Sequence, residues 1–292
     1  MKTPIKSALT LSASALLAVS ALATSAAHAA LWSDTSIGYR TGSQYSEPFN
    51  NTPFSKDIIS LNHVSGYKYG SNFFNADLLL SSATDPAGKG SKEGAHEVYV
   101  VYRHTLDLEK LTGTPYKFGP VRGVGLVGGF DFNTKTDAGY NSKKRMVVAG
   151  PMLMMDVPGF LNVGLLALWE SNAPFNTFTG VATNRYNYDV HPMVSVVWGI
   201  PFNAGIPLSF EGFANFIASK GKNEFGADTA NETNIDMQVM YDFGPALGAH
   251  KNALKVGLQY QYWENKFGNN ASGPAGSGAI AKTPMIRVEY HF

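Results

Sequence analysis

Apolar and polar side chains alternate along most of this chain, in segments of about ten residues. The last ten residues, "TPMIRVEYHF", place apolar side chains on one face and charged ones on the other: Ile286, Val288, Tyr290 and Phe292 against Arg287, Glu289 and His291. A period of two is that of a β-strand, whose successive side chains point to opposite faces. The pattern therefore predicts strands with one apolar and one polar face.

Twelve segments of the chain carry this alternation: residues 32–40, 57–67, 72–81, 96–106, 122–133, 145–155, 160–170, 185–198, 207–218, 232–243, 253–263 and 283–292. The segment 145–155 is the weakest, because it is apolar on both faces and contains Pro151. After the leader, no apolar run approaches the roughly 20 residues that a membrane helix needs. We therefore expect an all-β protein.

The connections between these segments differ in kind on the two sides of the sheet. Those after the odd-numbered segments are mostly long, polar and rich in Gly, Asn and Lys, as in residues 41–56, 82–95, 134–144, 219–232 and 265–282. The others are mostly short turns, with 107–120 as a longer exception. Long loops on one side, short turns on the other and an even strand number are typical of outer-membrane barrels, which leave no unpaired strand edge in lipid. Residues 30–292 are predicted to form a transmembrane antiparallel β-barrel of about 12 strands, with both ends periplasmic.

The first 29 residues have the layout of a secretory signal peptide. Lys2 and Lys6 precede an apolar run over residues 8–23, and Ala27 and Ala29 form a small-residue cleavage site. We expect residues 1–29 to be cleaved and the mature chain to reach the bacterial outer membrane. Without its two lysines the formal net charge falls from +1 to −1, which gives no electrostatic case for binding nucleic acid.

Aromatic residues gather at both ends of the predicted strands, as expected for girdles at two membrane interfaces. On the short-turn side these are Trp32, Tyr67, Trp198, Phe243, Tyr290 and Phe292, and on the long-loop side Tyr39, Trp169, Tyr186, Tyr188 and Tyr262. A final strand that ends in Phe resembles the signal by which the outer-membrane assembly machinery recognises its clients. We expect the C-terminal strand to engage that machinery.

Longer stretches resemble the Tsx-like family of nucleoside-specific, channel-forming outer-membrane proteins. They include "HVSGYKYGSNFFNADLLLSS" (63–82), "HEVYVVYRHTLDLEKLTG" (96–113), "FGPVRGVGLVGGFDF" (118–132), "MDVPGFLNVGL" (155–165), "VVWGIPF" (196–202) and "FEGFANF" (210–216). The resemblance runs from about residue 32 to 292 and implies a monomeric twelve-stranded barrel with a narrow pore. It implies passive passage of small hydrophilic solutes, nucleosides in particular.

The polar faces of the predicted strands supply candidate lumen residues. The parity of the alternation selects Asn75, Asp77, Glu97, Tyr99, Arg103, Ser209, Glu211, Phe213, Asn215, Asp236, Gln238, Arg287 and Glu289. We expect aromatic faces to stack on a planar base (Phe73, Tyr99 and Phe213) and polar groups to bind sugar hydroxyls (Asp77, Glu97, Arg103, Glu211, Asn215 and Asp236). Twelve strands should leave a narrow passage, since eight are filled by their own side chains and sixteen leave a wide channel.

Other interpretations remain open at this stage. The charged candidates Glu97, Arg103, Glu211, Arg287 and Glu289 could pair with one another in a filled lumen. A barrel with a filled lumen could be a lipid-modifying enzyme, or a surface receptor or adhesion protein. No serine lies in a nucleophile motif, and His104 and His191 are interpreted as interfacial or lumen residues, so an enzyme is not predicted.

No cofactor or metal is predicted either. The glycines at 123, 125 and 128 spell a dinucleotide-binding pattern, but they lie within a strand and open no helix. Basic residues in or beside the long loops are expected to meet phosphates of lipopolysaccharide: Lys89, Lys92, Lys135, Lys143, Lys144, Arg145, Lys220 and Lys222.

Overall fold

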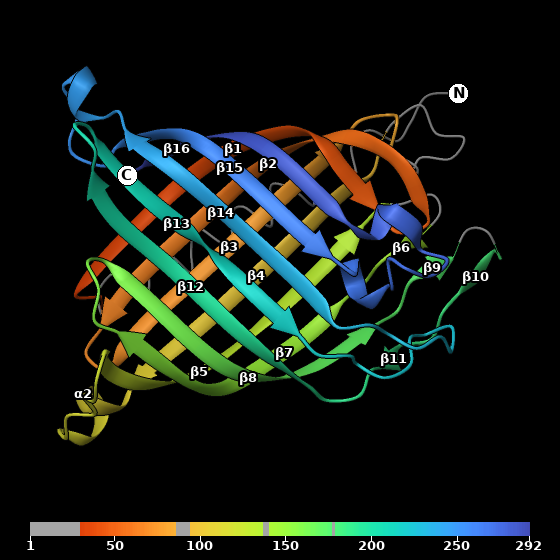
Figure 1. Cartoon of the computed structure of the whole chain (residues 1–292), viewed down its shortest axis with the longest axis horizontal. Helices are drawn as coiled ribbons and strands as arrows, with labels where there is room; N and C mark the ends of the chain where they lie inside the picture. Colours follow the sequence, from red (N-terminus) through yellow and green to blue (C-terminus); the bar gives the residue numbers. More distant parts are fainter. Residues whose placement is uncertain (1–29, 86–93, 137–139, 177–178) are drawn as a thin grey trace, which may run out of the picture.

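The computed structural model is a closed antiparallel β-barrel (Figure 1), and it describes residues 30–85, 94–136, 140–176 and 179–292. Its long strands pair with their neighbours in chain order, and the last strand pairs with the first, so the sheet has no free edge. The predicted leader, residues 1–29, lies outside the described residues. Among the residues described, no helix has the length and apolar character needed to span a membrane.

All twelve predicted segments form barrel strands. They are β1 (Trp32–Glu47), β2 (Asn50–Tyr67), β3 (Gly70–Ser81), β4 (His96–Asp107), β5 (Val121–Lys135), β7 (Arg145–Met155), β8 (Phe160–Asn172), β12 (His191–Asn203), β13 (Pro207–Ile217), β14 (Glu232–Asp242), β15 (Leu254–Glu264) and β16 (Ala281–His291). Each hydrogen-bonds two neighbouring barrel strands. The sequence prediction of a twelve-stranded all-β barrel is therefore confirmed.

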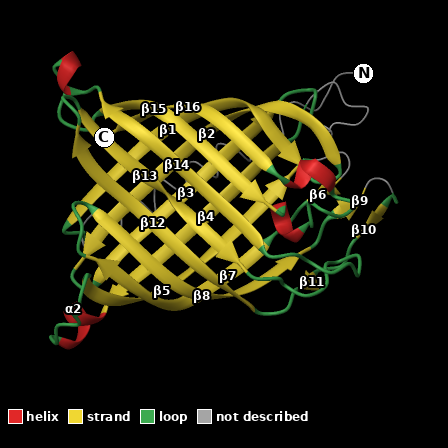
Figure 2. Ribbon diagram, in the orientation of Figure 1, coloured by secondary structure: helices red, strands yellow, loops and turns green. Residues whose placement is uncertain are grey.

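Short elements decorate the two ends of the barrel (Figure 2). At the long-loop end, β6 (Tyr140–Asn141), β9 (Phe175–Asn176) and β10 (Val181–Ala182) form a small separate sheet, and β11 (Tyr186–Asn187) pairs with β8. The 3₁₀ helices η3 (Lys266–Gly268) and η4 (Gly276–Ala279) lie at the same end. Helix α2 (Leu108–Thr112) and η2 (Pro245–Leu247) are at the short-turn end. By the usual orientation of such barrels, the long-loop end is extracellular.

The first hairpin differs from its prediction. Residues 41–56 were expected to form a long loop, but β1 and β2 continue through them to a tight turn at Pro48 and Phe49, where Phe49 has φ of 67°. The ladder has register shifts between Gly42 and Glu47. Beyond the membrane, the outward face of a strand meets water instead of lipid, so its side chains need not be apolar. A strand there has the composition of a loop.

The eighth predicted segment, 185–198, was also misplaced. Only residues 186–187 and 191 onward are extended, as β11 and β12, and β12 continues to Asn203.

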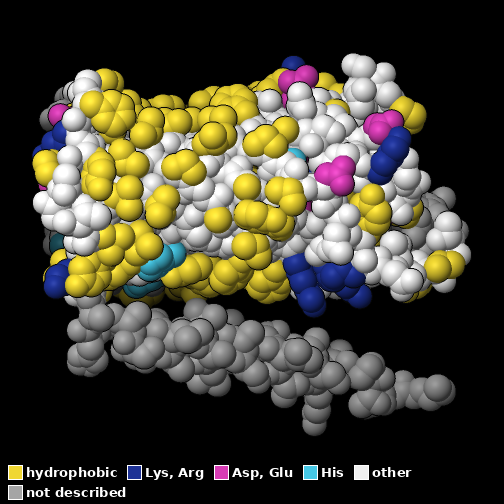
Figure 3. All heavy atoms as spheres, turned by 90° about the horizontal axis from the view of Figure 1, so that it is seen from below, with side chains coloured by type: hydrophobic (Ala, Val, Ile, Leu, Met, Phe, Trp, Pro, Cys, Tyr) yellow, Lys and Arg dark blue, Asp and Glu magenta, His cyan; other side chains and the backbone are white. Residues whose placement is uncertain are grey.

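Every barrel strand carries at least one large apolar side chain exposed on its outer face. One from each strand is Ile37, Ile59, Leu78, Val98, Leu126, Val147, Leu165, Val194, Phe216, Val239, Leu258 and Ile286. They belong to an apolar band around the barrel, one face of which Figure 3 shows. A band of this kind is stable in hydrocarbon and not in water. With the closed antiparallel sheet, it identifies a bacterial outer-membrane β-barrel.

Candidate functional site: the barrel lumen

The candidate site is the interior of the barrel, where the inward faces of the strands meet. The alternation in β3, β4, β13, β14 and β16 places every sequence-predicted candidate there: Phe73, Asn75, Asp77, Glu97, Tyr99, Arg103, Ser209, Glu211, Phe213, Asn215, Asp236, Gln238, Arg287 and Glu289.

Asp77 lies in a hydrogen-bonded triangle that joins three adjacent strands. Arg40 of β1 contacts its carboxylate at 2.6 Å, and Ser60 of β2 donates to the other carboxylate oxygen at 2.8 Å. Arg40 also donates to the Ser60 hydroxyl at 2.8 Å. Both charged side chains are only 12% exposed. Arg40 was missed by the sequence prediction, although its inward parity in β1 was available to find it.

The other charged candidates are paired as well, but mostly not with one another. Arg287 does contact Glu289, at 2.5 Å, as the filled-lumen alternative supposed. Arg103 contacts Asp131 of β5 at 2.5 Å, and Glu211 contacts Lys255 of β15 at 2.9 Å. Asp131 and Lys255 were not among the predicted residues.

The uncharged groups complete this network. Asn133 donates to Glu97, the Tyr99 hydroxyl donates to Asp131, Gln259 donates to Asp236, Ser195 donates to Asn215, and Ser209 and Gln238 donate to Glu211. These preorganised hydrogen-bonding groups lie on β12–β16 and β1–β5. A buried apolar cluster of Tyr45, Phe54, Ile58 and Met285 lies among the same strands.

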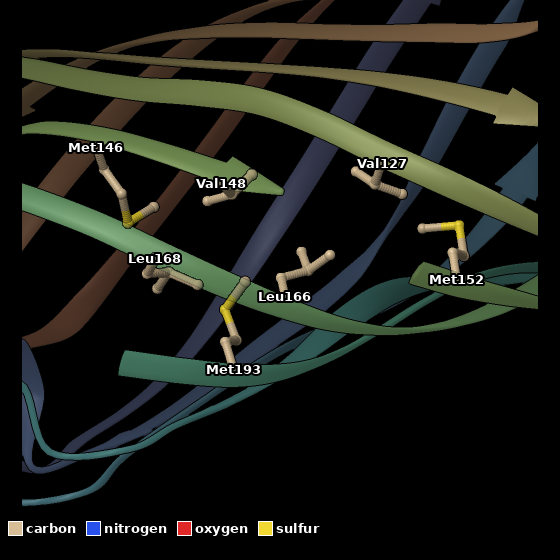
Figure 4. Packing of buried hydrophobic residues seen from close by; sticks show 7 residues of the cluster. All are labelled: Val127, Met146, Val148, Met152, Leu166, Leu168 and Met193. Carbon is tan, nitrogen blue, oxygen red and sulfur yellow. The ribbon is translucent and has the colours of Figure 1, made fainter. Parts of the chain in front are cut away.

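Part of the opposite side of the lumen is apolar and is named here the apolar arc, although the same strands also carry the inward polar residues Asp131, Glu170 and His191. Seven inward side chains of β5, β7, β8 and β12 pack together with at most 8% exposure (Figure 4): Val127, Met146, Val148, Met152, Leu166, Leu168 and Met193. This arc explains why residues 145–155 are apolar on both faces, since one face meets lipid and the other meets this cluster. The sequence prediction sought only polar lumen residues and missed the apolar arc.

Three lysines surround one carboxylate near the extracellular mouth. The Glu47 carboxylate lies 3.3 Å from the ammonium groups of Lys56 and Lys266, and 3.8 Å from that of Lys135. Glu47 is on β1 and Lys135 on β5, so this contact crosses the lumen and narrows it. Burial and the neighbouring ammonium groups lower the pKa of Lys266, in η3, to about 8.

The β13–β14 loop, residues 218–231, folds into the mouth. Its buried Lys220 contacts the lumen-facing Glu170 at 2.8 Å, and its Glu224 accepts hydrogen bonds from Tyr140, Asn172 and Tyr188. Burial and the Glu224 carboxylate raise the pKa of Tyr188, so this phenol stays a donor. Tyr188 was predicted to belong to the outer aromatic girdle; it is instead buried, because Glu224 draws it inward.

The two histidines that sequence analysis considered occupy different environments. His104 lies on the outer face of β4 and hydrogen-bonds the Tyr67 hydroxyl at 2.7 Å. His191 is buried on the lumen face of β12, with Nδ1 2.8 Å from the Asp189 carbonyl oxygen. Within the described residues, no group of three or more His, Asp and Glu side chains is arranged to hold a metal ion.

Comparison with known proteins gives only distant similarity. No family model and no curated protein sequence matches the chain. Among solved structures, the KdgM porin is 10% identical, with 88% of this chain and 99% of that chain covered and a TM-score of 0.42. The translocator domain of the autotransporter NalP from Neisseria meningitidis is 12% identical, with 89% and 88% covered and a TM-score of 0.46. OprB from Pseudomonas putida is 9% identical, with 92% and 96% covered and a TM-score of 0.27.

Proposed function

We propose that this barrel is a passive channel for small hydrophilic solutes, with nucleosides as the preferred class. The observation that carries the proposal is a lumen lined by hydrogen-bonding groups, with the ring of Phe73 accessible among them. A nucleoside matches both features, because its base is planar and weakly polar and its sugar carries several hydroxyls. The resemblance to Tsx-like channels in strands and periplasmic turns supports the same solute class. The chain is proposed to act as a monomer.

The side chains of the lumen suggest how such a solute would be held. Its base would stack on Phe73, which is 38% exposed, while hydroxyls would exchange hydrogen bonds with Asp77, Glu211 and Asp236. Since these carboxylates already have partners in the barrel, each solute contact replaces an existing hydrogen bond and gains little net free energy. Weak, exchangeable contacts are what a channel needs, because a tightly bound solute would not leave.

Phe73 offers the sharpest test of solute recognition. It lies on the lumen face of β3, opposite Arg103 in the register with β4, and is 38% exposed. Phe74 is the same residue type on the outer face of the same strand. If Phe73 stacks on the base, its loss should weaken binding by about 1–3 kcal/mol, or about tenfold or more in affinity.

The experiment is single-channel recording of the refolded protein in a planar bilayer, with nucleosides, free bases and sugars titrated on one side. We expect a small conductance that nucleosides block saturably, a weaker block in Phe73→Ala and an unchanged block in Phe74→Ala. Absence of conductance would overturn the channel and favour a filled barrel. Equal block by nucleosides and simple sugars would retain a channel and overturn the nucleoside preference.

A further inference from the structure

Basic side chains gather on the outer wall of the barrel at the extracellular edge of its apolar band (Figure 3). Three exposed residues form this group, named here the basic rim: Lys143 in the loop before β7, Arg145 at the start of β7, and Arg185 just before β11. The alternation in β7 points Arg145 outward, because the next residue, Met146, is in the buried lumen cluster. Lys143 lies in the loop before the strand and is exposed. Lys144, between them, points into the lumen, with its ammonium 6.0 Å from the ring centre of Tyr99.

The basic rim is held in place by hydrogen bonds. The Arg185 guanidinium donates to the Ser171 hydroxyl at 3.0 Å and to the Lys143 carbonyl oxygen at 3.1 Å. Arg145 is paired with the same Ser171 in the β7–β8 register. Desolvation and the nearby charge of Arg145 lower the pKa of Arg185, in agreement with two guanidinium groups held close together. An anion placed between them would relieve this repulsion.

The other basic residues expected to meet lipopolysaccharide are placed differently. Lys135, Lys144 and Lys220 turn inward and contact Glu47 or Glu170, and the exposed Lys222 contacts Asp228 at 2.7 Å. Lys89 and Lys92 lie outside the described residues. By contrast, none of the three rim residues has an ion pair with a carboxylate among the residues that the structure describes.

Beneath the basic rim is an apolar surface. A cavity of about 520 Å³ is lined by the rim and by the outward side chains of Phe130, Phe132, Val147 and Trp169. Its one acidic lining residue, Asp131, is bound on the lumen side by Arg103 and Tyr99. The cavity thus combines an aromatic floor toward the hydrocarbon with guanidinium and ammonium groups at the water interface.

We propose that the basic rim is a binding site for the phosphoryl groups of lipid A in the outer leaflet of the membrane. Lipid A presents phosphates at the interface and acyl chains below them, in the same order as the rim and its aromatic floor. Guanidinium groups bind phosphate oxygens bidentately, and fixing Arg185 beforehand reduces the entropy lost on binding. The rim lies at the edge of the band, where an exposed Arg or Lys costs far less than the roughly 2–4 kcal/mol it costs at the bilayer midplane.

The test uses the full mature chain refolded in detergent and titrated with bisphosphorylated lipid A, with bound lipid counted by native mass spectrometry. We expect saturable binding that weakens about tenfold or more in the double variant Arg145→Gln/Arg185→Gln, as expected for losing two charge-assisted contacts. Lys282→Gln is the matched control, because Lys282 is exposed on the outer face at the extracellular end of β16, away from the rim. We expect it to bind lipid A as the parent does.

Two further binding measurements distinguish a lipid site from a general anion site. Dephosphorylated lipid A should bind no more tightly to the parent than to the double variant, and inorganic phosphate should displace lipid A only weakly. Equal binding of lipid A by parent and double variant would overturn the proposal. So would inorganic phosphate binding as tightly as lipid A. Arg185→Gln alone, which changes a loop residue outside the barrel wall, repeats the test if the double variant does not fold.

Discussion

At the scale of single residues, position in the barrel determines what a charged side chain can do. Lys266 illustrates this, since it is buried at the mouth with its ammonium 2.7 Å from the Ser46 carbonyl oxygen and over the rings of Trp263 and Phe267. Its charged neighbours are Glu47, Lys56 and Lys135. Three lysines around one carboxylate make this part of the mouth electropositive, and Lys266 is the one whose pKa falls near the physiological range.

This arrangement predicts an anion preference that weakens with rising pH. Because the pKa of Lys266 is lowered to about 8, its charge is present below that pH and lost above it. Reversal potentials across a salt gradient, recorded at about pH 6 and about pH 10, should therefore show a drop in anion preference. Lys266→Met should remove the part of the drop centred near pH 8. Lys222→Met, at an exposed loop lysine, should leave it in place; a pH response identical in all three proteins would contradict the prediction.

The same lysine has a consequence for stability with a definite sign. Its folded-state pKa lies below the value of 10.5 for an unperturbed lysine, so the unfolded chain binds the proton more tightly. The protonated side chain therefore costs folding free energy below about pH 8, and this cost fades as the pH rises toward 10.5.

At the scale of elements, periodicity was enough to find all twelve barrel strands, because contact with lipid imposes a period of two wherever a strand crosses the membrane. Periodicity failed at residues 41–56, where the strands leave the membrane and their outward side chains are no longer apolar. Parity also separates inward from outward side chains in these strands. It could not supply their partners, since the Arg103–Asp131 and Glu211–Lys255 pairs depend on cross-strand register and side-chain reach. The apolar arc was missed because an apolar lumen wall and a lipid-facing wall have the same composition.

The β13–β14 loop folds into the mouth, and we expect it to constrict the passage. Glu224 fastens it to Tyr140, Asn172 and Tyr188 of other segments, and removing this carboxylate would take away an acceptor that these three side chains share. Asn172 would keep its hydrogen bond to the Tyr140 hydroxyl. We expect Glu224→Ala to release the loop, so that single-channel recordings show larger and noisier conductance. Asp228→Ala removes a carboxylate from the same loop that contacts only the exposed Lys222, and it should leave the conductance unchanged. Equal effects of the two changes would show that the loop does not constrict the passage.

At the scale of the whole molecule, the barrel depends on a seam between the two ends of the chain. β16 pairs with β1 from Thr41 to Ser36, and the Phe292 amide donates to the Thr35 carbonyl oxygen at 3.0 Å. The hydrogen bonds of the seam are backbone interactions, so they do not require a particular side chain at position 292. The Phe292 ring is 64% exposed and contacts Tyr290 at a centroid distance of 6.3 Å. A ring so exposed contributes little to the packing of the finished barrel.

A terminal aromatic that the fold itself hardly needs is expected to act during assembly. Phe292→Ala should therefore lower the amount of barrel inserted in the outer membrane of cells several-fold, while the purified chain still refolds in detergent with the yield of the parent. Phe202→Ala is the control, because Phe202 is an exposed aromatic at the same periplasmic end, on β12. If both variants insert equally poorly, the effect comes from the loss of any interfacial aromatic. If Phe292→Ala also fails to refold in detergent, the ring stabilises the seam, and recognition by the assembly machinery is not needed to explain its presence.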